Sequence, residues 1–119
     1  MNKLTIIGFV LTFAVASAAT ASAKGEKATV TGEVIDTFCY ATMGAKGASH
    51  KQCGIDCAKK GIAVGLLEKG TDKVYVLLPT KDKTPLPDTV INKMGETTTV
   101  TGDKYTSGGA TFLTVESVK

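Results

Sequence analysis

Arginine and tryptophan are absent from this chain of 119 residues, and it contains only three prolines, three cysteines and one histidine. All 14 basic residues are therefore lysines, and they stand against 11 acidic residues for a formal net charge of +3. The lysines are spread along the sequence rather than clustered. Without a basic patch or a series of stacking aromatics, we expect no nucleic-acid-binding surface and no membrane-binding one in the mature protein.

The N-terminal segment has the three parts of a secretory signal peptide. A short basic start precedes an apolar run, Leu4 to Ala16, and small residues then end in the cleavage pattern Ala21-Ser22-Ala23. We therefore predict a signal peptide over residues 1–23 and one exported domain, periplasmic or secreted, over residues 24–119. Cleavage after Ala18 is the alternative. An oxidising compartment makes each cysteine a disulfide partner, a metal ligand or a reactive thiol.

The rest of the sequence has mostly β-strand patterns. Alternating or β-branched runs predict strands over residues 28–35, 62–67, 74–78, 97–101 and 110–118, with Gly32 marking a bulge or bend in the first. A helix is predicted from His50 to Lys60, with Ser49 as its N-cap and Gly54 as its weak point. A shorter helix is expected between Pro87 and Met94.

This order of elements predicts a mainly β fold, a small five-stranded OB-like barrel. The Cys/His-bearing helix is inserted after the first strand, and the short helix falls between the third and fourth strands, as in an OB-fold. A generic small β-sandwich is the alternative.

The scarce side chains are concentrated in one segment. Cys39, His50, Cys53 and Cys57 are the chain's only cysteines and histidine. On one helix, the last three would fall within a stripe about 60° wide, and Cys39 would approach from the end of the first strand. Three thiolates and an imidazole suit one Zn(II), and the same soft donors suit Cu(I), to which Met43 could add a thioether.

A disulfide is the other interpretation of the cluster that stays open. Cys39 could form a disulfide with Cys53 or Cys57, which leaves one spare thiol because the number of cysteines is odd. A bridge between Cys53 and Cys57 is disfavoured by their spacing on a helix. A cysteine hydrolase would need an orienting carboxylate. The two candidates, Asp36 and Asp56, are better explained as a strand-end turn residue and a solvated helix residue.

The whole predicted domain resembles a family of small exported bacterial proteins, largely without assigned function. The resemblance rests on Gly32-Glu33-Val34-Ile35-Asp36-Thr37-Phe38-Cys39, on the segment from His50 to Cys57, and on Val100-Thr101-Gly102 and Val115-Glu116-Ser117. It implies an OB-like barrel in the periplasm or outside the cell, and no particular reaction.

Together these observations predict a non-enzymatic metal-binding domain. Cys39, His50, Cys53 and Cys57 would hold one zinc or copper(I) ion per chain, for structure or for metal handling. A thiol–disulfide redox protein is the first alternative and the main enzymatic one. The second is a partner-binding OB-like module without metal, which would act on another exported protein.

Overall fold

A computed structural model describes residues 25–119; the predicted signal peptide lies outside them. The elements, in chain order, are β1 (Glu26–Asp36), α1 (Thr37–Met43), the 3-10 helix η1 (Ala48–His50), α2 (Lys51–Lys59), β2 (Val64–Glu68), β3 (Val74–Leu78), α3 (Asp88–Ile91), β4 (Thr97–Ser107), β5 (Ala110–Thr114) and β6 (Ser117–Val118). Within the described part of the chain, no helix is both long and apolar enough to cross a membrane.

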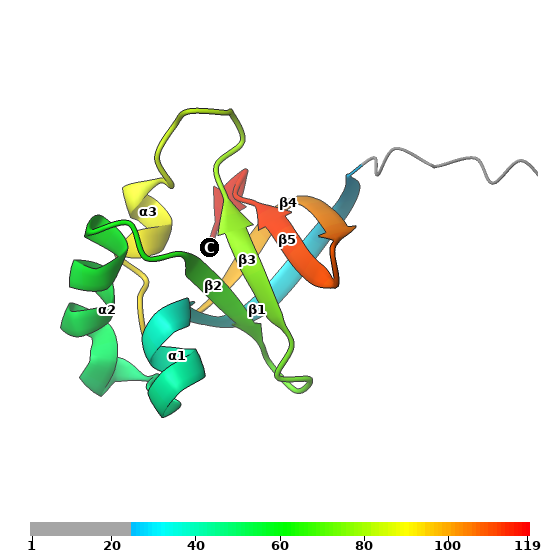
Figure 1. Ribbon diagram of the computed structural model, residues 1–119. Helices are drawn as coiled ribbons and strands as arrows, with labels where there is room; N and C mark the ends of the chain where they lie inside the picture. Colours follow the sequence, from blue (N-terminus) through cyan, green and yellow to red (C-terminus); the bar gives the residue numbers. More distant parts are fainter. Residues whose placement is uncertain (1–24) are drawn as a thin grey trace, which may run out of the picture.

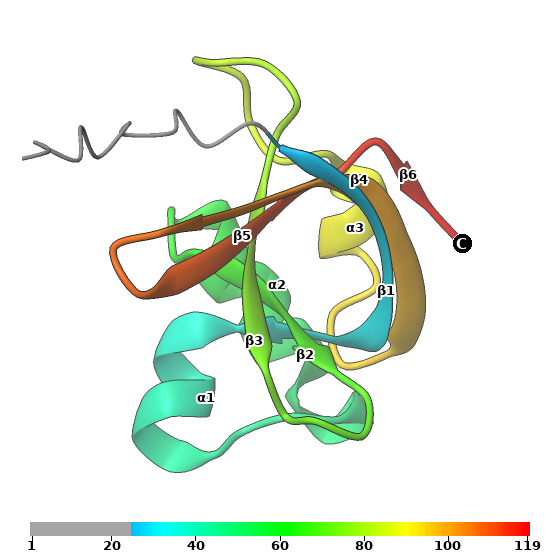
Figure 2. The same cartoon turned by 90° about the vertical axis from the view of Figure 1, so that its right-hand side faces the viewer.

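Five of the strands close into a mixed barrel. The order β1-β2-β3-β5-β4 is closed by antiparallel pairing of β4 with β1, and only β3 and β5 run parallel. The strand β6 is an addition that pairs with β4. Figures 1 and 2 show the strands wrapping around the core, with the helices gathered beside one part of the barrel. The predicted OB-like barrel is confirmed, including the helical insertion after β1 and the position of α3 between β3 and β4.

The long strand β1 bends as it passes from one partner to the other. It pairs with β4 over residues 26–33 and with β2 over residues 32–36, so Gly32 belongs to both ladders. A Cβ atom at Gly32 would lie 2.3 Å from the carbonyl oxygen of Leu67. The predicted bend at Gly32 is therefore accompanied by a close backbone approach that no side chain could occupy.

Several predicted boundaries shift because strands change partners. The second strand starts at Val64 rather than at residue 62, and β4 continues to Ser107 because its residues 104–107 pair with β5. Only Gly108 and Gly109 remain for the turn of that hairpin. The predicted last strand, 110–118, is divided into β5 and β6, which lie against different partners.

Among the described residues, the buried side chains are apolar apart from Asp36, Thr98 and Thr111. The largest fully buried side chains are Ile35, Leu66, Met94, Leu113, Val34, Val90, Val100 and Asp36. Met94, just after α3, forms a parallel bridge with Val34 and so brings the α3 segment against β1. Asp36 is the only charged residue in this set. A carboxylate without contact with water requires hydrogen-bond partners, and these lead to the cysteine–histidine segment.

Candidate metal centre

Asp36 ends β1 and caps the helix that follows it. Its Oδ1 atom accepts a hydrogen bond of 2.8 Å from the backbone N–H of Cys39, which is the third residue of α1. This is the normal bond of an N-cap carboxylate, and it fixes where α1 begins. The expected strand-end turn is thus a helix cap, and Cys39 lies inside a short helix rather than at the end of the strand.

The second oxygen of Asp36 contacts the only histidine. Oδ2 of Asp36 lies 2.5 Å from Nε2 of His50, whose side chain is 14% exposed. An ionised carboxylate can only accept, so Nε2 of His50 carries the proton and the ring's lone pair is left on Nδ1. A metal-binding histidine commonly has this arrangement, in which the other ring nitrogen donates to a carboxylate.

His50 reaches Asp36 from a tighter turn than the sequence predicts. It ends η1 and is itself the N-cap of α2, while Ser49 lies within η1 and no side chain caps α2. The predicted helix is present as α2, but the prediction that Ser49 is its N-cap is wrong. Gly47, with φ of 84°, precedes the turn, and its N–H donates to the carboxylate of Glu33. This hydrogen bond holds the start of η1 against β1.

The three cysteines are free thiols with graded exposure. Cys39 is 5% exposed, Cys57 is partly buried and Cys53 is exposed to solvent. The cluster therefore extends from the barrel core to the surface. An ion bound there would have a buried ligand in Cys39 and a solvent-accessible ligand in Cys53.

Two groups of metal-binding atoms share Cys39. In the first, Cys39, His50 and Cys53 each offer a donor atom, and all three atoms lie within 4.8 Å of one another. In the second, the same holds for Asp36, Cys39 and Cys57. The four predicted ligands thus belong to two groups that overlap at Cys39. Cys57 is grouped with Cys39 and Asp36 rather than with His50. Both groups could hold a metal ion.

Burial and charge raise the pKa values of two thiols in the cluster, whereas at Asp36 they act in opposite directions. Burial raises the pKa of the Cys39 thiol to about 12, and the neighbouring Asp36 carboxylate contributes to the rise. The pKa of Cys57 is raised by the same two causes, burial first. Burial alone would raise the pKa of Asp36, but its bonds from Cys39 and His50 outweigh this and lower it. The buried negative charge of Asp36 thus disfavours a free thiolate beside it and favours a cation there.

Close packing holds α2 against the barrel. Gly54 is buried, and a Cβ atom there would lie 2.5 Å from Cγ of Met94. The neighbouring Ile55 belongs to the barrel core, and Lys51 forms an ion pair with Glu96 just before β4. Gly54, which weakens the helix by propensity alone, is what lets α2 approach Asp36 closely enough for the cluster to form.

The donors fit a soft metal ion. Tetrahedral zinc with bonds to sulfur of about 2.3 Å needs sulfur atoms roughly 3.8 Å apart, so separations of up to 4.8 Å require only small side-chain movements. Thiolates and an imidazole are the donors that Zn(II) and Cu(I) prefer, while the oxygens of Asp36 already accept hydrogen bonds. Asp36 accordingly orients His50 and does not need to bind the metal itself.

Asp36 is the member of the site that sequence reasoning missed. Asp56, the other carboxylate considered, is exposed and accepts a hydrogen bond from Gln52, as expected of a solvated helix residue. The signal that distinguishes Asp36 is the spacing Asp36-Thr37-Phe38-Cys39, because an N-cap aspartate three residues before a cysteine brings its carboxylate to that cysteine's N–H.

No protein-family model, curated protein or solved structure matches the chain. The family resemblance drawn from the motifs therefore stays a prediction, and the function has to be argued from the geometry of the cluster.

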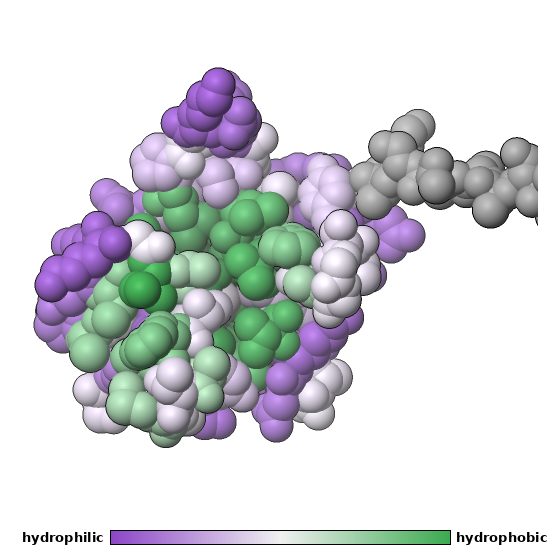
Figure 3. Space-filling view, viewed as in Figure 1, coloured by the Kyte–Doolittle hydropathy of each residue, from purple (hydrophilic) through white to green (hydrophobic). Residues whose placement is uncertain are grey.

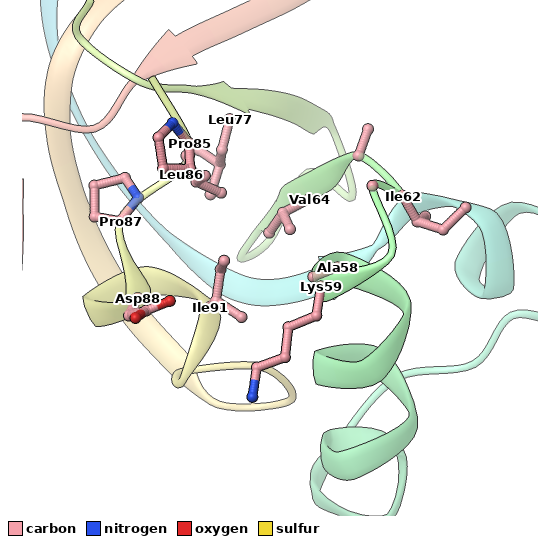
Figure 4. A pocket seen from close by; sticks show the side chains of 12 residues that line it. Ala58, Lys59, Ile62, Val64, Leu77, Pro85, Leu86, Pro87, Asp88 and Ile91 are labelled. Carbon is pink, nitrogen blue, oxygen red and sulfur yellow. The ribbon is translucent and has the colours of Figure 1, made fainter. Parts of the chain in front are cut away.

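A separate hollow opens beside the cluster, between α2, β2, β3 and the segment around α3. It has a volume of about 570 Å³, and its walls are mainly apolar (Figure 4). Lys59 of α2 and Asp88 of α3 contribute opposite charges to it, and Pro85 to Pro87 form one wall. Figure 3 shows hydrophobic residues gathered over the neighbouring strands and helices on this face. The hollow contains none of the thiols, so it is not part of the metal centre.

Proposed function

We propose that this protein is an exported, non-enzymatic metal-binding domain in which Cys39, His50, Cys53 and Cys57 bind Zn(II) or Cu(I), with one ion completing the Cys3His set. One observation carries the proposal: donor atoms from three separate elements, α1, η1 and α2, converge within 4.8 Å around Cys39. Cysteine and histidine occur nowhere else in the chain, so every side chain of these two types belongs to this cluster.

The surroundings of Cys39 support a built site rather than a chance cluster. Asp36 is fully buried and has one oxygen committed to the Cys39 backbone and the other to His50. A carboxylate that holds a histidine in one orientation strengthens metal binding by that histidine. Binding would also replace thiol protons by a cation beside the carboxylate, which relieves the unfavourable burial of its charge.

The gradient of exposure favours metal handling over a purely structural ion. The side chain of Cys53 reaches solvent, and exposed Phe38 and Met43 stand on α1, so a metal ion in the cluster would have one solvent-accessible ligand. An ion could therefore be acquired and released through Cys53 while Cys39 stays in the core.

To test the proposal, the full chain is expressed with export and the protein is isolated free of metal. Metal is then titrated into this protein. One Zn(II) or at least one Cu(I) per chain should be retained against a chromophoric chelator, and His50→Ala should weaken retention at least tenfold. Gln52→Ala, an exposed change in the same helix, is the matched control and should bind like wild type. Equal retention by His50→Ala and wild type would remove His50 from the ligand set.

A thiol–disulfide protein is the second candidate, and one distance supports it. The sulfur of Cys39 lies within 4.8 Å of the sulfurs of both Cys53 and Cys57, close enough for a disulfide after modest side-chain rotation. Such a protein would keep one reactive thiol, and its disulfide would be unaffected by His50→Ala. Counting thiols therefore separates this candidate from the metal-binding one.

A further inference from the structure

The two groups of donors around Cys39 differ in composition. The first has two sulfurs and a nitrogen, from Cys39, Cys53 and His50, and the second has two sulfurs and a buried carboxylate oxygen, from Cys39, Cys57 and Asp36. Cys39 is the only residue common to both. A cluster organised around one central thiol can serve one ion with four donors or two ions with fewer donors each.

We propose that the cluster binds two Cu(I) ions, which share the Cys39 thiolate as a bridge, although it binds only one Zn(II). The inference rests on the proposed metal-binding function and extends it to the occupancy of the site. The first copper would be held by Cys39, His50 and Cys53. The second would be held between Cys39 and Cys57.

The coordination preferences of the two metals lead to different occupancies. Zn(II) requires four ligands in tetrahedral geometry, which the cluster can supply only by committing all three cysteines and His50 to one ion. Cu(I) is satisfied by two or three soft ligands, and thiolate sulfur readily bridges two such ions. A nearly linear S–Cu–S unit also spans a wider sulfur separation than a tetrahedral one does, so Cys39 and Cys57 can remain near their positions.

Asp36 supports the second ion through its charge. Its oxygens accept bonds from the Cys39 N–H and from His50, and a hard carboxylate is a poor ligand for soft copper. Its negative charge nevertheless lies within 4.8 Å of the two sulfurs that would hold the ion. Each thiol gives its proton to solvent as its sulfur binds, and the copper stays Cu(I), so no oxidant or reductant is needed.

The experiment is an anaerobic titration of the metal-free protein with tetrakis(acetonitrile)copper(I) against bathocuproine disulfonate, with a parallel titration using Zn(II). Wild type should retain two Cu(I) and one Zn(II) per chain, and X-ray absorption of the copper form should show copper–copper scattering. Cys57→Ser should retain one Cu(I) and lose that scattering. Circular dichroism of each variant checks its fold, and the scattering in wild type tests the bridge without any variant.

The outcomes separate the two proposals. One Cu(I) per wild-type chain, or two Cu(I) in Cys57→Ser, would overturn the bridged pair while leaving metal binding itself intact. Retention of neither Zn(II) nor Cu(I) would overturn the proposed function together with this inference. Two Cu(I) without copper–copper scattering would place the second ion elsewhere and overturn the shared thiolate.

Discussion

Oδ2 of Asp36 lies 2.5 Å from Nε2 of His50, and this contact joins the end of β1 to the turn that begins α2. The carboxylate is fully buried, while the imidazole is 14% exposed. The same Asp36 caps α1 and thereby positions Cys39. One buried side chain thus contacts two candidate metal ligands that are 11 positions apart in the sequence.

Replacing Asp36 with Asn should weaken metal binding while preserving the cap of α1. Asparagine is as good an N-cap as aspartate, so the bond to the Cys39 N–H survives, but the charge that orients His50 is lost. Loss of such an outer carboxylate typically lowers metal affinity by roughly 10- to 100-fold. Competition titration with Zn(II) measures the change. Asp56→Asn is the matched control, and equal affinities in both variants would show that Asp36 has no role in orienting the histidine.

The metal-free protein should lose stability as the solution becomes alkaline. Cys39 keeps its proton in the folded state up to its raised pKa of about 12, whereas an unfolded cysteine releases its proton near pH 8.5. The contribution of this thiol to the free energy of unfolding is therefore complete below about pH 8.5, and it declines between that pH and about 12. Urea unfolding at a series of pH values measures it. Cys39→Ala should show a flatter decline, and an identical decline in the variant would contradict the assignment.

Gly54→Ala should destabilise the protein even though alanine is the better helix former. The propensity gain is about 1 kcal/mol, but the added methyl group would overlap the side chain of Met94, and overpacking of this kind costs about 1–3 kcal/mol. We expect a lower midpoint of thermal unfolding and weaker metal retention, because α2 must move away from Asp36. Gln52→Ala, on the exposed face of the same helix, should not lower the midpoint. A stabilised Gly54→Ala protein would show that α2 is packed less closely.

Met43→Leu should leave the affinity for Cu(I) unchanged. The sequence makes this thioether a candidate for a further copper ligand, but Met43 is 68% exposed at the end of α1. Leucine preserves the size and apolar character of the side chain. A chelator competition with Cu(I) should give the same result for variant and wild type. A clear loss of affinity would place Met43 among the ligands.

The barrel could be predicted from sequence because its signals are local. Alternating residues in β1, the polar turn between β2 and β3, and Pro87 before α3 each specify an element without reference to distant residues. The strand ends could not be predicted in the same way. The extension of β4 to Ser107 and the division between β5 and β6 depend on which strand pairs with which, a property of the closed barrel.

The site shows the same division between local and distant information. The scarcity of cysteine and histidine indicates the cluster, but nothing in the sequence around Asp36 indicates its complete burial or its bond to His50. The two overlapping donor groups also follow from how α1 and α2 pack against β1 and Met94. Helical periodicity places three residues on one face of an ideal helix, but it contains no information on how α1 and α2 pack against β1 and Met94.

The most direct test of the metal-binding account is elemental analysis combined with thiol counting on protein recovered from the exported fraction. The account predicts at least one equivalent of zinc or copper per chain and three titratable thiols after denaturation without reductant. Protein with no stoichiometric metal and a single titratable thiol would contradict it, and would show instead that Cys39 is joined to a cysteine of α2 by a disulfide.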